Sequence, residues 1–146
     1  MASVRVLLAD DHVQLLAELG VQLGGVFEVV GAVENGEQAV AAAIRLNPDV
    51  LVLDISMPIM NGFEAAARLR DLKCQTKIVI LTTYDDDEYI YEAFSVGASA
   101  YVAKRHFGTD LVTAIRQVIH GNTFVSPSLL STEGRDVTRF AAKHPS

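Results

Sequence analysis

Tryptophan is absent from this 146-residue sequence, and Cys74 is its only cysteine. A single cysteine excludes an intrachain disulfide, a CxxC redox pair and a cysteine-rich zinc site, so we expect a reducing compartment, the cytoplasm. No apolar run approaches the roughly 18 residues that cross a bilayer, and no membrane partner is expected. Lys and Arg number 12 against 18 Asp and Glu, for a formal charge of −6. This excess of negative charge repels DNA phosphates and predicts a chain that binds nucleic acid poorly by itself.

Five short apolar runs, rich in Val, Ile and Leu, alternate with segments whose apolar residues repeat at helical spacing. Runs without strict polar alternation are typical of strands covered on both faces. The strand starts lie 22 to 28 residues apart, which predicts an α/β fold with a five-stranded parallel sheet and right-handed crossovers. The predicted strands are 4–9, 27–33, 50–53, 78–81 and 100–103, and the predicted helices are 13–23, 37–46, 62–72, 86–96 and 111–119.

The length of the chain and its punctuation indicate one domain. Gly121 stands where the fifth helix should end, and glycine is the commonest residue just after a helix. We therefore place the domain at 1–121. Residues 122–146 contain Ser126-Pro127 and then a weakly helical polar stretch, which we interpret as a linker or an extra helix.

The candidate site consists of the residues that follow the predicted strands. In an open parallel sheet, ligands bind outside the carboxyl ends of the strands. Three carboxylates, a hydroxyl and an ammonium are expected together at that edge, because the first strand is followed by Asp10-Asp11, the third by Asp54, the fourth by Thr82-Thr83 and the fifth by Lys104.

This set of side chains suits a magnesium ion and phosphoryl chemistry. Clustered carboxylates raise one another's pKa unless a cation neutralises them, and Mg²⁺ prefers oxygen ligands. A carboxylate beside Mg²⁺ can attack a phosphoryl group, and we expect Asp54, alone at the middle of the edge, to be that nucleophile. Lys104 and the Thr82 hydroxyl can then hold the phosphoryl oxygens.

Each of these residues also has a structural interpretation. Asp10 and Asp11 could cap the helix that follows them. Lys104 could be an ordinary surface lysine. Thr82 and Thr83 cannot be told apart by residue type, since β-branched residues are common in strands.

Five segments resemble the receiver domain of bacterial two-component response regulators, in particular the NarL/FixJ (LuxR-type) branch: VRVLLADDH, ENGEQAV, PDVLVLDISMPIMNGFEAA, KIVILTTYDDDEYIYEAFSVGASAYVAK and DLVTAIRQVIHG. The resemblance extends from residue 4 to about residue 127. It implies a flavodoxin-like (βα)5 fold, a doubly wound parallel sheet of five strands in three α/β/α layers. It also implies a phosphorylation switch whose partner is a sensor histidine kinase.

The resemblance gives each edge residue a role. Asp54 would be the phosphoacceptor. Asp11 would bind Mg²⁺ directly, Asp10 would act mainly through water, and the backbone carbonyl of Ser56 would add another ligand. Lys104 would bind the phosphoryl group.

Two further implied roles and two departures concern the loops around the site. Thr82 is the implied switch hydroxyl, and Tyr101 the implied switch aromatic that turns inward on activation. The family often has Pro after a cis peptide where this chain has Arg105, and a non-proline cis bond costs about 3 kcal/mol, which leaves the geometry of that turn open. Tyr84 and Ser56 stand where the family tunes access of water to the acyl phosphate, and we hypothesise that Tyr84 slows hydrolysis.

We predict a phosphoacceptor that catalyses its own phosphorylation and slow dephosphorylation, not an enzyme acting on other substrates. A phosphatase of the haloacid-dehalogenase type would need a second Asp two residues after the nucleophile as its acid and base, and that position is Ser56. A phosphorylation-independent interaction module is the remaining alternative, and the complete acidic set with Lys104 argues against it.

The output is expected to be transcription regulation. Regulators of this branch usually carry a helix-turn-helix DNA-binding domain after the receiver, and no complete one fits in 122–146. We therefore expect DNA to be bound only through a domain absent from this chain, with a homodimer forming on activation. A stand-alone receiver is the alternative.

Overall fold

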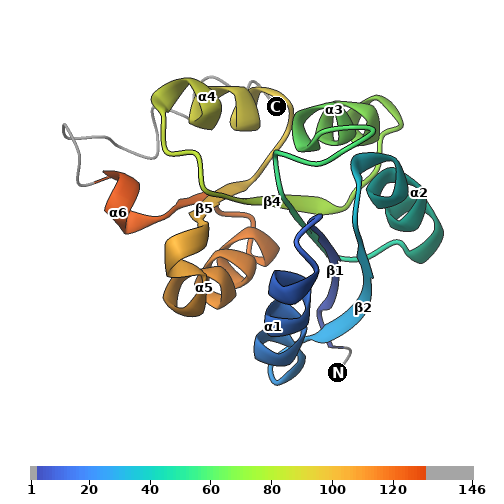
Figure 1. The fold of residues 1–146 in the computed structure, drawn as a ribbon, viewed down its shortest axis with the longest axis horizontal. Coiled ribbons are helices and arrows are strands. Elements are labelled where there is room, and N and C mark those ends of the chain that lie inside the picture. The colour runs from blue at the N-terminus through green and yellow to red at the C-terminus, as the bar shows by residue number, and fades with distance from the viewer. Residues whose placement is uncertain (1–2, 131–146) are drawn as a thin grey trace.

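The structure is a computed structural model that describes residues 3–130 of the chain. Within this range, parallel strands form one sheet in the order β2-β1-β3-β4-β5-β6 (Figure 1). The strands are β1 Arg5–Ala9, β2 Glu28–Val33, β3 Val50–Leu53, β4 Lys77–Thr82, β5 Ala100–Ala103 and β6 Phe124–Val125.

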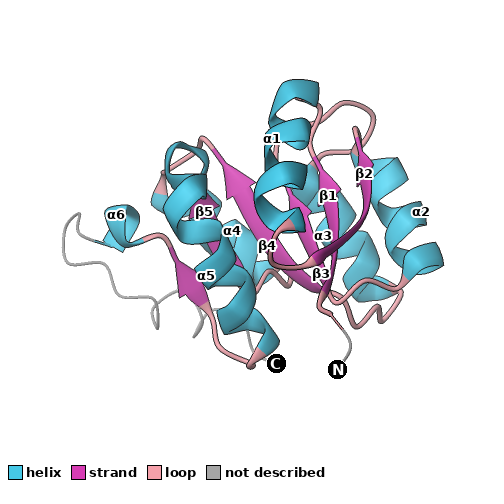
Figure 2. Cartoon of the chain, turned by 90° about the horizontal axis from the view of Figure 1, so that it is seen from below, coloured by secondary structure: helices cyan, strands magenta, loops and turns pink. Residues whose placement is uncertain are grey.

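Helices cover both faces of the sheet and give the molecule three layers (Figures 1 and 2). One face is packed by α1 (Val13–Gly24) and α5 (Phe107–Ile119). The other is packed by α2 (Gly36–Leu46), α3 (Gly62–Asp71) and α4 (Asp87–Ser95). A short 3₁₀ helix, η1 (Lys104–His106), leads into α5, and α6 (Pro127–Leu130) follows β6. In the described part of the chain, no helix is both long and apolar enough to cross a membrane.

The central strands explain why their sequences lack polar alternation. Successive side chains of a strand point to opposite faces of the sheet. In β3, Leu51 packs on the side of α2, α3 and α4, whereas Val50 and Val52 pack on the side of α1 and α5. Because both faces are covered, every position of β3 is buried and apolar residues are required throughout.

The five predicted strands and the five predicted helices are confirmed, in the order expected of a doubly wound sheet. The structure adds β6, which pairs with β5 through Ala100–Phe124 and Tyr101–Val125. Val125 and Leu129 join the same core as α4, so the packed structure continues beyond residue 121. The remainder of the predicted linker, 131–146, lies outside the described residues.

The loop between β3 and α3 is closely packed where the chain returns toward Asp54. Asn61 caps α3 through a reciprocal capping box with Glu64. At Gly62, the next residue, a Cβ atom would overlap the backbone carbonyl of Asp54 and lie 2.9 Å from the Cα of Ile55. Glycine is therefore required at this position because the neighbouring atoms belong to the backbone and cannot rotate away.

We expect Gly62→Ala to lower the free energy of unfolding by about 1–3 kcal/mol, the usual effect of inserting a methyl group into packed structure. Gly20→Ala is the matched control, since a Cβ at this position in α1 meets no atom within 4 Å and alanine favours a helix by up to about 1 kcal/mol. Equilibrium urea unfolding measures both variants. A Gly62→Ala chain as stable as the wild type would contradict the packing argument.

Candidate functional site

The sheet brings the predicted residues to one edge. Asp10 follows β1 and Asp54 follows β3, and these strands are neighbours with Ala9 opposite Leu53. The Asp54 amide donates to the carbonyl of Ala9 at 3.0 Å, so the backbone pairing continues up to the site. Lys104 follows β5 in the same way.

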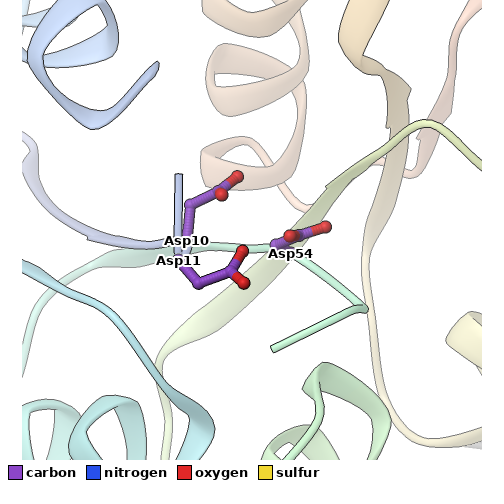
Figure 3. Close-up of side chains that lie close together, drawn as sticks. All are labelled: Asp10, Asp11 and Asp54. Carbon is purple, nitrogen blue, oxygen red and sulfur yellow. The ribbon is translucent and has the colours of Figure 1, made fainter. Parts of the chain in front are cut away.

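Three carboxylates meet at this edge (Figure 3). Asp10, Asp11 and Asp54 each offer an oxygen, and these oxygens lie within 4.8 Å of one another. Asp10 is 2% exposed and Asp54 4% exposed, whereas Asp11 is exposed. Two of the three negative charges are therefore removed from solvent and lie in the protein interior, where like charges repel more strongly than in water.

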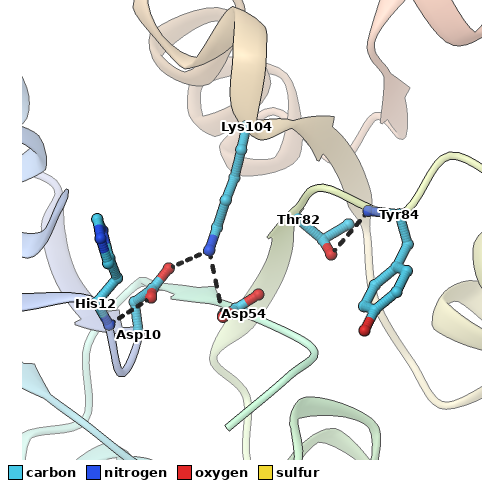
Figure 4. A network of polar contacts seen from close by, with 6 residues as sticks. All are labelled: Asp10, His12, Asp54, Thr82, Tyr84 and Lys104. Atoms are coloured by element: carbon cyan, nitrogen blue, oxygen red, sulfur yellow. Dashed lines mark hydrogen bonds and ion pairs between the residues drawn. The ribbon is translucent and has the colours of Figure 1, made fainter.

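Lys104 partly neutralises the two buried carboxylates. Its Nζ lies 2.8 Å from Oδ2 of Asp10 and 3.3 Å from Oδ2 of Asp54 (Figure 4). The other oxygen of Asp10 accepts the amide hydrogen of His12 at 2.8 Å. Asp10 thus both orders the turn into α1 and faces the site, and Lys104 is a site residue, not a free surface lysine.

Burial and charge set the protonation of the pair. Burial and, to a lesser extent, the charge of Asp10 raise the pKa of Asp54, Lys104 lowers it, and the net result is a pKa of about 6. Burial lowers the pKa of Lys104, but its hydrogen bond to Asp10 and the charges of both carboxylates outweigh this effect, so that the pKa of Lys104 is raised. Lys104 therefore stays an ammonium at neutral pH, while Asp54 is mostly ionised above about pH 6.

The donor set fits a hard divalent cation. Among residues 3–130, three carboxylates face the ammonium of Lys104 alone, so negative charge remains for a cation to neutralise. Carboxylate oxygens are ligands that Mg²⁺ accepts. The site opens into a cavity of about 570 Å³, which leaves room for the waters that Mg²⁺ retains. Ser56, the predicted backbone ligand, lines the same cavity with Asp11 and Asp54.

The two threonines at the end of β4 lie differently. Thr82 is 1% exposed, and its hydroxyl oxygen accepts the amide hydrogen of Tyr84 at 3.3 Å. Thr83 lines the cavity. Figure 4 shows Asp54 between Asp10 and Thr82. Thr82 thus stands beside Asp54 with its hydroxyl engaged in the β4–α4 loop.

Tyr101 of β5 is fully buried and contacts the β4–α4 loop. Its hydroxyl donates to the carbonyl of Tyr84 at 2.7 Å. Burial, followed by the charges of Asp85 and Asp86, raises the pKa of Tyr101, so the hydroxyl keeps the proton that it donates. Tyr101, the switch aromatic implied by the resemblance, is therefore in its inward position in this structure.

The ring of Tyr84 packs sideways. It stacks on Tyr89 of α4, with ring centroids 4.5 Å apart and planes at 16°. Tyr89 in turn lies 6.1 Å from the Phe63 ring of α3. Tyr84 also lines the cavity, so this aromatic row fixes a residue at the rim of the site.

The turn after Lys104 needs no cis peptide. Among residues 3–130 every peptide bond is trans, and Lys104–His106 form the 3₁₀ turn that leads into α5. Arg105 thus lies in a helical turn, and the peptide bond before it is trans, unlike the cis bond often found at this position in the family that the sequence resembles.

Sequence reasoning missed two backbone contacts of the site. Gly62 packs against the carbonyl of Asp54, and Asn61-Gly62 alone indicates only a turn. Ser126 binds the backbone of β5 just before Lys104. The apolar pair Phe124-Val125 before Ser126 is the only signal of that strand in the sequence.

Comparisons with known proteins agree with this geometry. The model of the response regulator receiver domain family matches residues 6–116. The transcriptional regulatory protein YvfU of Bacillus subtilis is 36% identical over 135 residues, which cover 91% of this chain and 68% of YvfU. The transcriptional regulatory protein DegU of Brevibacillus brevis is 35% identical over 130 residues, covering 86% of this chain and 54% of DegU. The chain therefore spans between about half and two thirds of these relatives.

Solved structures show the same fold. The signal receiver domain of the response regulator NarL from Mycobacterium tuberculosis has a TM-score of 0.80 at 29% identity, covering 84% of this chain and 100% of that domain. A LuxR-family DNA-binding response regulator from Staphylococcus aureus has a TM-score of 0.74 at 31% identity, covering 80% of this chain and 98% of that structure.

We expect Asp54→Asn to raise the free energy of unfolding of the metal-free chain by about 1–3 kcal/mol at neutral pH, because the variant no longer buries a carboxylate charge. The folded wild type binds the Asp54 proton more tightly than its unfolded form. Its stability relative to the variant therefore increases as the pH falls through about 6, and the difference disappears near the ordinary carboxyl value of 3.8.

Urea unfolding in EDTA over this pH range measures the effect. Asp71→Asn is the control, because the Asp71 side chain is 73% exposed. An Asp54→Asn chain no more stable than the wild type at neutral pH would refute the charge argument.

Proposed function

Because this chain belongs to the response regulator receiver-domain family, we propose that Asp54 accepts a phosphoryl group from the phosphohistidine of a sensor histidine kinase. The supporting observation is the ammonium of Lys104 placed 3.3 Å from the Asp54 carboxylate and 2.8 Å from that of Asp10. In the transfer, an Asp54 oxygen forms the new bond to phosphorus while the phosphorus–nitrogen bond of the donor breaks. The imidazole nitrogen keeps that electron pair.

Asp54 must be ionised to act as the nucleophile, and the nearby ammonium favours this form. Lys104 is positioned to follow the charge as it moves from the carboxylate to the phosphoryl oxygens, since it can exchange its contact with Asp54 for one with the new group. Such preorganised charge is the main contribution that a protein makes to phosphoryl transfer.

Asp10, Asp11, Asp54 and the carbonyl of Ser56 would hold Mg²⁺, and the ion would supply positive charge to offset that of the transferred group. Asp11 is exposed beside the two buried carboxylates, a position suited to direct coordination from the solvent side. Asp10 keeps one oxygen on His12 and the other on Lys104, which suits it to act on the ion through water.

The switch would operate through the β4–α4 loop. The Thr82 hydroxyl oxygen accepts the amide hydrogen of Tyr84, and the Tyr101 hydroxyl donates to the Tyr84 carbonyl. A phosphoryl oxygen on Asp54 would accept the hydroxyl hydrogen of Thr82, draw that side chain toward Asp54 and so change the loop that Tyr101 holds. The surface around α4 and β5 would then differ between the two states.

The chain is a phosphoacceptor, and its relatives are transcriptional regulators. We extend this to an output in transcription through a DNA-binding domain, with a homodimer formed on activation and a cytoplasmic location. A phosphatase acting on other substrates is disfavoured because Ser56 occupies the position of the second carboxylate.

Incubation with acetyl phosphate and Mg²⁺, followed by intact-mass spectrometry, tests the proposal. We expect one phosphoryl adduct in the wild type and in Asp71→Asn, and none in Asp54→Asn or in EDTA. Failure of the wild type to form the adduct, with no binding of Mg²⁺ in a titration, would instead favour a phosphorylation-independent interaction module.

Tyr84→Ala is expected to shorten the lifetime of the acyl phosphate roughly three- to tenfold, equivalent to about 0.7–1.4 kcal/mol in the barrier to hydrolysis. The reason is that the ring lines the cavity and restricts water beside Asp54. Loss of the adduct with time, followed by mass spectrometry after removal of the donor, gives the lifetime. Tyr84→Phe keeps the ring and should match the wild type, whereas a longer-lived adduct in Tyr84→Ala would exclude this role.

A further inference from the structure

We propose that Ser126 is a positioning residue for Lys104, and that it ties the segment leaving the receiver to the strand that carries the switch residues. The inference rests on the proposed function and extends it to a residue beyond the last helix of the five strand-helix units.

Ser126 is fully buried and makes two backbone contacts with β5. Its hydroxyl oxygen accepts the amide hydrogen of Ala103 at 3.0 Å. Its own amide donates to the carbonyl of Tyr101 at 3.0 Å. These bonds lie on either side of Val102, so Ser126 fixes the backbone of the last residues of β5 before Lys104.

The side-chain contact has a specific cause in the path of the chain. The pairing of β6 with β5 ends at Val125, and Pro127 starts α6 directly afterwards. The chain therefore turns away before another backbone carbonyl can reach Ala103. The Ser126 hydroxyl takes the place of that carbonyl, and without it a buried amide would lose its partner.

The contact is one covalent link from the site. Ala103 is bonded to Lys104, whose Nζ holds Asp10 and Asp54, and Tyr101 holds the β4–α4 loop through Tyr84. Ser126 thus touches the backbone of the strand between the two residues that would respond to a phosphoryl group.

The same residue anchors the chain on its way out. The Leu129 amide donates to the Ser126 carbonyl at 2.9 Å, and Leu129 is 2% exposed in the core that includes Tyr101. In Figure 1, α6 lies next to β5 at that side of the sheet. Because linkage between two sites is reciprocal, a segment that steadies Lys104 must itself respond when Lys104 is drawn to a phosphoryl group.

The test compares phosphorylation rates with acetyl phosphate and Mg²⁺ for the full chain, Ser126→Ala, Lys104→Ala and the double variant. We expect Ser126→Ala to slow phosphorylation about three- to tenfold when Lys104 is present, and less than about twofold in the Lys104→Ala background, since residues that act through one another are not additive. Thr123→Ala, an exposed position in the same segment, should match the wild type.

Amide hydrogen exchange of the wild type gives a second measurement that needs no variant. With Mg²⁺ and beryllofluoride bound, exchange at Ala103 and Ser126 should slow together by at least about threefold. Unchanged exchange at both amides would overturn the inference, as would equal slowing by Ser126→Ala in both backgrounds. A wild-type chain that takes no phosphoryl group overturns the proposed function itself, whereas normal phosphorylation of Ser126→Ala overturns only the role of Ser126.

Discussion

The central constraint on this structure is that two carboxylates, those of Asp10 and Asp54, are held close together at one edge of the sheet. Asp10 and Asp54 are almost completely buried and lie side by side because β1 and β3 are paired up to Ala9 and Leu53. Repulsion and burial both disfavour two carboxylates there, which is why the pKa of Asp54 is raised to about 6. The ammonium of Lys104 makes the arrangement tolerable by contacting both, and the charge that remains makes the edge a site for a cation.

The rest of the fold can be understood as support for that edge. Helices on both faces bury the central strands, and the site lies beyond their carboxyl ends. Gly62 allows α3 to start directly against the Asp54 carbonyl, where any side chain would displace the backbone of Asp54. Tyr84 is held by Tyr101 and Tyr89 at the cavity rim.

Most of this arrangement could be predicted from the sequence because it follows from local pattern and topology. Apolar runs locate β1 to β5, and the carboxyl ends of parallel strands must share an edge, which brings Asp10, Asp54 and Lys104 together. The details that escaped prediction are tertiary. A strand as short as Phe124–Val125 has no periodicity of its own and exists because β5 offers an edge. The two threonines differ only in which one β4 buries, Thr82 in this fold.

Strand β5 connects the site at Lys104 to the segment formed by β6 and α6. On one side it pairs with β4, which ends at Thr82, and on the other with β6, which leads out through Ser126. Its side chains divide between the two cores, Tyr101 on the α4 side and Val102 on the α5 side. A shift of this four-residue strand would therefore also displace the β4–α4 loop, the helices on both faces of the sheet, and the segment formed by β6 and α6. Close-packed interiors transmit strain, so under the proposed function a change in the charge that Lys104 contacts would be passed through β5 to the surface.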